Sequence, residues 1–228
     1  MERRVDHVVD RAAEVAAAGD AARAVLEAKH RARETTLSVA RQAIRCCAVS
    51  IRAVQRREFD AARGHIAEAA ALLDEASRAT DEHRDVRYAG FLHDAQKEFA
   101  EANLTLAFVA HEPMPTARAL GVETPAYLNG MAEAASELRR QVLDCLRRAD
   151  LAEAEELFGV MDEVYGLMVT VDYPEALTAG LRRTTDALRA VLERTRGDVT
   201  NAVVAARFEA AARPAGSPPG GPAGPDTA

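Results

Sequence analysis

An apolar residue recurs at alternating steps of three and four over many turns of this sequence, and this spacing limits its possible folds more than any other feature. The stripe is clearest in the first third of the chain, where its members are Leu37, Ala40, Ile44, Cys47, Ile51 and Val54. Steps of three and four place side chains on one face of an α-helix. The spacing therefore predicts one long helix that reaches about Arg57 and buries this face.

The same spacing returns later in the chain and predicts a bundle. The further helices are expected at about residues 59–79, 88–111, 125–148, 150–171 and 174–196, with a weaker helical segment to about residue 212. Breaks are expected at Gly19-Asp20 and Gly197-Asp198. Aromatic residues are only 4% of the chain, and tryptophan is absent, so the aromatic runs of sheets are lacking. We predict an all-α fold, a single-domain antiparallel bundle of six to seven helices.

The two ends of the chain, its cysteines and its net charge limit the kinds of protein that it can be. Residues 213–228 are rich in proline and glycine, so a disordered tail is expected after a helical domain of residues 1–212. No run of 18 apolar residues and no apolar segment behind the charged N-terminus is present, so neither a membrane span nor an export signal is expected. The three cysteines lack zinc spacing, which favours reduced thiols and a cytoplasmic location. A net charge of −7 argues against a generally basic protein that coats nucleic acid.

Two pairs of glutamates lie at helical spacing beside the apolar stripes. Glu98 and Glu101 are three residues apart in "QKEFAEANL", and Glu133 and Glu137 are four apart in "NGMAEAASELRR". Each pair therefore shares one face of its helix. Gly130 lies one turn before Glu133, where a mid-helix glycine costs about 1 kcal/mol relative to alanine. Close approach of another backbone or of a ligand is a frequent reason for such a glycine.

Four carboxylates would converge if these two helices packed with the acidic faces together. Like charges at short range require protonation or a cation, and oxygen ligands favour hard ions such as Mg²⁺ or Mn²⁺. One or two such ions can support phosphoryl transfer by activating water. A di-iron site fits less well, because His93 and His111 do not fall at the offset of bundle di-iron motifs. The alternative is a solvated acidic surface, on which Glu137 interacts with Arg140 and Gln141.

Together these segments resemble the translin family, and within it the branch of translin-associated factor X. The stretch "QKEFAEANLTLAFV" is similar to a family helix with an E-[FY]-x-E core, and "YLNGMAEAASELRRQVLD" is similar to the family's signature helix. The resemblance covers about residues 33–203. Two positions depart from the family pattern: Glu133 stands where an aspartate is usual, and Ala126 replaces the aspartate that precedes the tyrosine, here Tyr127.

The resemblance implies a seven-helix bundle that assembles into a hollow homo-oligomer, an octamer in the family, around single-stranded nucleic acid. It also implies that members like factor X are Mg²⁺-dependent endoribonucleases whose acids face the cavity, whereas translin-like members bind RNA and lack those acids. The residues that match the family's catalytic and metal-binding acids are Glu98, Glu101, Glu133 and Glu137.

A row of arginines on the first long helix offers a place for RNA. Its members, spaced by four, seven and four residues, are Arg41, Arg45, Arg52 and Arg56. The row lies roughly a quarter turn from the apolar stripe, and guanidinium groups in such a row can contact phosphates. The alternative is a solvated face whose arginines pair with neighbouring acids. Lys97, beside Glu98, is a further candidate for RNA contact, or it pairs with a neighbouring acid.

The sequence therefore predicts a metal-dependent endoribonuclease that cleaves single-stranded RNA inside a homo-oligomer, with Mg²⁺ or Mn²⁺ as cofactor. Few aromatic residues are available to stack on bases, so little sequence preference is expected. Two alternatives stay open. One is a non-catalytic scaffold of the same shape that binds single-stranded RNA or DNA, and the other is a helical interaction module with no role in nucleic-acid binding.

Overall fold

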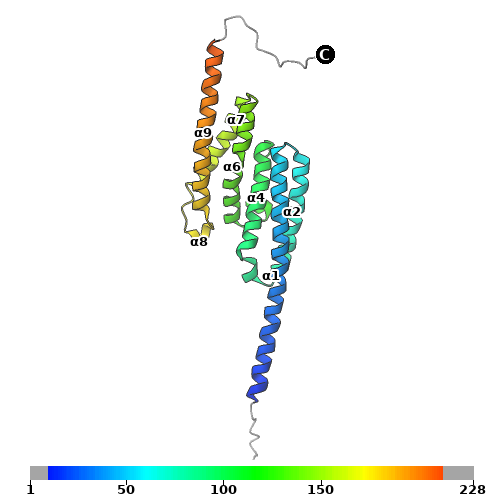
Figure 1. The fold of residues 1–228 in the computed structure, drawn as a ribbon. Helices are drawn as coiled ribbons and strands as arrows, with labels where there is room; N and C mark the ends of the chain where they lie inside the picture. Colours follow the sequence, from blue (N-terminus) through cyan, green and yellow to red (C-terminus); the bar gives the residue numbers. More distant parts are fainter. Residues whose placement is uncertain (1–9, 213–228) are drawn as a thin grey trace, which may run out of the picture.

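The computed structural model describes residues 10–212, and within this range it contains nine α-helices and no strand. Six long helices form the bundle, and three one-turn helices lie in the connections (Figure 1). The long helices are α1 (Arg11–Gln55), α2 (Phe59–Thr80), α4 (Gly90–Val109), α6 (Thr124–Arg147), α7 (Leu151–Met168) and α9 (Leu181–Ala212). The short helices are α3 (Arg84–Arg87), α5 (Ala117–Leu120) and α8 (Glu175–Thr178). The predicted all-α class is confirmed, and the predicted tail at 213–228 lies outside the described residues.

Three predicted helix boundaries are wrong. Helix α1 continues through Gly19-Asp20, and α9 continues through Gly197-Asp198. A helical glycine costs only about 1 kcal/mol. The alanines around Gly19 offset this cost, whereas at Gly197 the burial of Thr195 and Val199 and the Arg139–Asp198 ion pair hold α9 in place. The last long helix also begins later than Pro174, because Ala179 and Gly180 adopt left-handed conformations that separate α8 from α9.

The core-facing side of α1 follows a strict repeat of four and three. The residues of this repeat that are at most 1% exposed are Thr36, Ala40, Ala43, Cys47, Ser50 and Val54. Most of these side chains are small, so α2 and α4 can pack closely against α1. Ser50 shows the closeness directly, because its hydroxyl donates to the Ala62 carbonyl oxygen of α2 at 3.0 Å.

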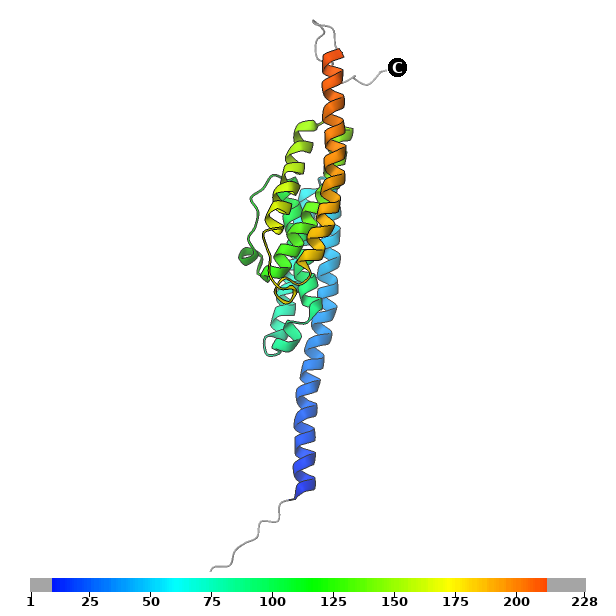
Figure 2. The same ribbon diagram turned by 90° about the vertical axis from the view of Figure 1, so that its left-hand side faces the viewer.

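Helices α4 and α6 run in the same direction, which the prediction of an antiparallel bundle did not include. The connection between them, residues 110–123, returns along the side of the bundle before α6 begins (Figure 2). The Tyr127 hydroxyl fastens this connection by donating to the Pro115 carbonyl oxygen at 2.9 Å. A short link would have forced antiparallel neighbours, whereas this longer connection permits a parallel pair. The remaining consecutive long helices alternate in direction (Figure 1).

Helix α4 lies between the two apolar clusters of the core and contributes to both. One cluster joins α4 to α1 and α2, and the other joins it to α6, α7 and α9. The buried Asn129 amide ties α6 to the junction between α8 and α9, since it donates to the Thr178 carbonyl oxygen at 2.9 Å and accepts from the Thr184 hydroxyl at 2.6 Å. Among the helices of residues 10–212, none is both long and apolar enough to cross a membrane.

Candidate metal centre

Helices α4 and α6 approach each other closely at Gly130. A Cβ atom at this position would lie 2.5 Å from the Lys97 carbonyl oxygen, 2.8 Å from the Ala100 Cβ and 2.9 Å from the Glu101 amide nitrogen. Two of these three atoms belong to the α4 backbone, so the contact could be relieved only by moving the helices apart. Gly130 therefore sets the distance between the two acidic helix turns, and backbone approach is the reason for this glycine.

Three of the four predicted glutamates converge beside this contact. One carboxylate oxygen each from Glu98, Glu101 and Glu133 lie within 4.8 Å of one another. Glu101 is only 8% exposed, while the side chains of Glu98 and Glu133 are 26% and 32% exposed. The acidic cluster, as we call these three residues, thus has one deep carboxylate and two that solvent reaches. Three oxygen donors in this arrangement fit a hard divalent cation such as Mg²⁺ or Mn²⁺.

Lys97 lies within the acidic cluster and neutralises part of its charge. Its ammonium nitrogen is 2.7 Å from a Glu133 oxygen and 3.5 Å from a Glu98 oxygen. Burial disfavours the charged lysine, but the hydrogen bond to Glu133 and the nearby acids outweigh this effect and raise the pKa of Lys97. The ammonium group is therefore held by carboxylates, in agreement with the pairing that the sequence left open.

Burial and mutual repulsion disfavour the ionised forms of the carboxyl groups in the acidic cluster. Burial and the charges of Glu98, Glu133 and Glu137 raise the pKa of Glu101 to about 9, with only partial compensation by Lys97. Burial also raises the pKa of Glu98, with Glu133 acting in the same direction. A cation among these oxygens would offset the repulsion, which is the electrostatic condition expected of a metal site.

Glu137 lies beside the acidic cluster and is not one of the three converging groups. Its carboxylate accepts a hydrogen bond from the Gln55 side chain of α1 at 2.8 Å. Gln141 does not bond to Glu137 and instead donates to the Gln55 carbonyl oxygen at 3.1 Å. Helix α1 thus fixes Glu137 from outside the α4 and α6 pair, while the charge of Glu137 still acts on Glu101.

The predicted arginine row lies on the exposed side of α1. Arg41, Arg45 and Arg52 are exposed, and the structure records no ion pair for them among residues 10–212. Arg56 is also exposed but forms an ion pair with Glu58 at 2.7 Å. Because Gln55 follows Arg52 by one turn and bonds to Glu137, the row runs along α1 towards the acidic cluster.

Comparison with known proteins relates this arrangement to a family. No protein-family model matches the chain. An uncharacterised protein of Methanocaldococcus jannaschii, MJ0175, is 30% identical over 176 residues, which are 75% of this chain and 76% of that protein. The structure of AfC3PO in complex with duplex RNA is 31% identical, has a TM-score of 0.74, and is matched over 82% of this chain and 96% of its own. The chain belongs to the translin family.

A more distant translin-type structure shares the fold. Apo-NeC3PO is 16% identical, with a TM-score of 0.71 over 80% of this chain and 96% of its own. The two departures from the translin pattern can now be placed. Glu133, with its longer side chain, still reaches the acidic cluster. Ala126 is buried in the core, while the neighbouring Tyr127 holds the crossover connection and does not bond to the acids.

Two residues that act on the acids, one by a hydrogen bond and one by its charge, were not identified from the sequence. Gln55 holds Glu137, and the charge of Asp94 contributes to the raised pKa of Glu98 from one turn earlier on α4. Asp94 could have been found from its spacing of four before Glu98. Gln55 gives no local signal, because its role depends on the packing of α1 against α6.

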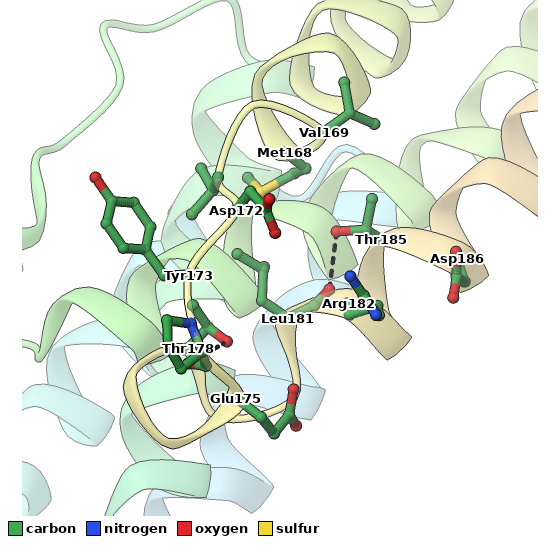
Figure 3. A pocket seen from close by; sticks show the side chains of 12 residues that line it. Met168, Val169, Asp172, Tyr173, Glu175, Thr178, Leu181, Arg182, Thr185 and Asp186 are labelled. Atoms are coloured by element: carbon green, nitrogen blue, oxygen red, sulfur yellow. Dashed lines mark hydrogen bonds between the residues drawn. The ribbon is translucent and has the colours of Figure 1, made fainter.

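A separate cavity lies at the junction of α7, α8 and α9 (Figure 3). Its volume is about 700 Å³, and its lining includes Asp172, Tyr173, Arg182 and Asp186 but none of the four glutamates. Its lining carries both positive and negative side chains, and its carboxylates do not form a converging group like the acidic cluster. The acidic cluster is therefore the better candidate for chemistry.

The raised pKa of Glu101 predicts that stability falls as pH rises when divalent cations are removed. Below its ordinary pKa of 4.5 the carboxyl is protonated in both folded and unfolded chains, so it imposes no penalty. Between 4.5 and about 9 only the unfolded chain ionises, so stability is lost progressively across this window. Thermal melting in EDTA from pH 5.5 to 9 measures this loss. Glu101→Gln should flatten the dependence, and an unchanged slope would contradict it.

Proposed function

We propose that this translin-family chain is an endoribonuclease that depends on a divalent cation. The observation that carries the proposal is the convergence of Glu98, Glu101 and Glu133 at a position that solvent can reach. The similarity to AfC3PO, whose structure includes RNA, supports RNA as the class of substrate. Metal-dependent nucleases use carboxylate oxygens to hold the metal ion that acts on the RNA phosphate.

Glu98, Glu101 and Glu133 would hold the cation. When bound, Mg²⁺ or Mn²⁺ supplies Lewis acidity that activates water and stabilises the charge on the leaving oxygen. Three carboxylates and the Lys97 ammonium carry a net charge of −2, which one divalent ion balances. We therefore favour one ion per chain over two.

The remaining polar residues of the site orient these ligands. Lys97 bonds to Glu133 and lies close to Glu98, so it holds the two partly exposed carboxylates in place. Glu137 is outside the acidic cluster and is fixed by Gln55, which leaves it suited to accept a proton from the attacking water. Glu101, the deepest group, anchors the cation and must lose its proton to do so.

The exposed arginines of α1 would bind the RNA backbone. Phosphate contacts position a nucleic acid without reading its sequence, so cleavage should depend little on sequence and weaken with added salt. The sequence predicts a single-stranded substrate, while the AfC3PO complex contains duplex RNA. Both forms of RNA therefore belong in the assay. A hollow homo-oligomer that encloses the strand remains part of the proposal.

Replacement of Arg41, Arg45 and Arg52 together by glutamine should weaken RNA binding. Loss of three phosphate contacts is expected to lower affinity by roughly tenfold or more and to reduce the logarithmic salt slope by about 2. Fluorescence anisotropy of a labelled RNA at several salt concentrations measures both quantities. The matched control removes three arginines from α9, Arg182, Arg183 and Arg189, and gives the same net charge. Equal losses in the two variants would mean that only net charge matters.

Cleavage of end-labelled RNA by the purified chain tests the proposed function. We expect cleavage in Mg²⁺ that stops when EDTA is added and resumes when Mg²⁺ is restored. RNA binding with no cleavage in Mg²⁺ or Mn²⁺ would instead identify a non-catalytic scaffold. Absence of RNA binding at low salt would identify a helical interaction module.

A further inference from the structure

The N-terminal half of α1 extends well beyond the bundle (Figures 1 and 2). From Arg11 to Glu27 every residue except Gly19 is exposed. Counted from the N-terminus, Lys29 makes the first ion pair of α1 with a later helix, because its ammonium group lies 2.8 Å from an Asp85 oxygen of α3. Nearly five helical turns, at about 3.6 residues per turn, therefore lack a covering element within residues 10–212.

The exposed half of α1 carries the same repeat as its buried half. If the steps of four and three are continued from Thr36 towards the N-terminus, they pass two charged residues, Arg33 and Lys29, and then reach an apolar set that we call the α1 seam. Its members are Ala12, Val15, Gly19, Ala22 and Leu26. Val15 is 72% exposed and Leu26 is 64% exposed, with Val25 beside them at 55%. The repeat that packs against other helices from Thr36 onward thus continues without a partner in the described part of the chain.

We propose that the α1 seam binds the α1 seam of a second copy of this chain, with the two helices antiparallel. A repeat of four and three is the pattern that packs one helix along another, so the occupant should be a helix. In antiparallel register, Val15 of each copy lies opposite Leu26 of the other, and Gly19 lies opposite Ala22. The larger side chains then meet at both ends, and the smallest meet at the centre, where the helices can approach closely.

The charges along this segment favour the antiparallel direction. In this register residues 11–20, with one arginine and two acids, lie opposite residues 21–30, with one arginine, one lysine and one acid. An antiparallel pair places the acidic end of one copy beside the basic end of the other. A parallel pair would place like ends together. Charge complementarity therefore favours a second copy in this direction.

Gly19 permits close approach of a partner. The three nearest heavy atoms within 4 Å of a Cβ at this position all belong to the Arg23 side chain, which can swing aside. A partner helix could therefore approach α1 at Gly19 as closely as α4 approaches α6 at Gly130.

Cysteine cross-linking tests the pairing in the full chain. In a Cys46→Ser background, the double variant Val15→Cys/Leu26→Cys should form a covalent dimer under mild oxidation. Each single variant should stay uncrosslinked, because the two copies of either residue would lie about 16 Å apart along the helix axis, beyond disulfide reach. The introduced cysteines stand at exposed positions and Cys46 is only partly buried, so the fold should tolerate these variants.

A matched control has the same register on the opposite face. Ala17→Cys/Ala24→Cys is related by the same antiparallel symmetry but points away from the α1 seam, so it should not cross-link. Cross-linking of either single seam variant would show a parallel pair and overturn the proposal. Failure of the double seam variant, or equal cross-linking of the control, would also overturn it. The assay uses neither RNA nor metal, so its result is independent of the proposed nuclease function.

Discussion

Glu101→Gln is expected to reduce RNA cleavage by roughly 100-fold or more, the scale of losing one preorganised electrostatic group. Glutamine keeps the size of the side chain but offers the cation only a neutral amide oxygen. Glu101 is the most deeply buried member of the acidic cluster, and the other two carboxylates already occupy their own positions in it. The cleavage rate under saturating RNA, with Mg²⁺ present, measures the loss.

The same substitution should make the folded chain more stable in EDTA at pH 7 to 9. Burial holds the pKa of Glu101 at about 9, so wild type must keep a proton that its unfolded chain would release. Glutamine removes this penalty. A residue needed only for folding would lose activity and stability together, whereas Glu101→Gln separates them. The control is Glu163→Gln on the exposed face of α7, which should change neither. Cleavage at the wild-type rate would remove Glu101 from the site.

Gly130→Ala is expected to lower the free energy of unfolding by about 3 kcal/mol, at the upper end of overpacking costs. The added Cβ would meet the backbone of α4 at Lys97 and Glu101, and a backbone cannot rotate away as a side chain can. For a domain of this size the melting temperature should fall by about 10 °C. Because the helices must separate, the affinity for Mn²⁺ should fall as well.

Gly159→Ala provides the matched control for this prediction. Gly159 lies inside α7, and nothing comes within 4 Å of a Cβ at this position. Alanine should therefore stabilise α7 by up to about 1 kcal/mol through helix propensity. Thermal melting of the two variants beside wild type gives opposite shifts if the close approach at Gly130 is real. Similar shifts in both variants would contradict it.

The sequence was sufficient to predict most of the helices, because spacing of apolar residues reports directly on a buried helix face. It failed where local propensity competed with longer-range packing. Gly19-Asp20 and Gly197-Asp198 resemble breaks, but alanines continue α1 through the first pair, and packing of Thr195 and Val199 continues α9 through the second. The parallel direction of α4 and α6 depends on how the connecting segment packs, and no local signal encodes it.

The acidic site was predictable to a similar degree. The spacing of the glutamates predicted two acidic faces, and Gly130 marked the point where a second backbone could approach. Their convergence required the structure, which also placed Glu137 beside the cluster because Gln55 binds it. The position of Lys97 between Glu98 and Glu133 could not be chosen from sequence, since the alternatives differ only in the rotamer of a long side chain.

RNA cleavage by the purified chain should be followed during a titration with Mn²⁺, with bound Mn²⁺ counted by electron paramagnetic resonance in the same samples. We expect the cleavage rate to rise in proportion to occupancy, to reach its limit at one ion per chain, and to disappear in EDTA. Cleavage that persists in EDTA, or full occupancy with no cleavage, would contradict a metal-dependent nuclease built on Glu98, Glu101 and Glu133.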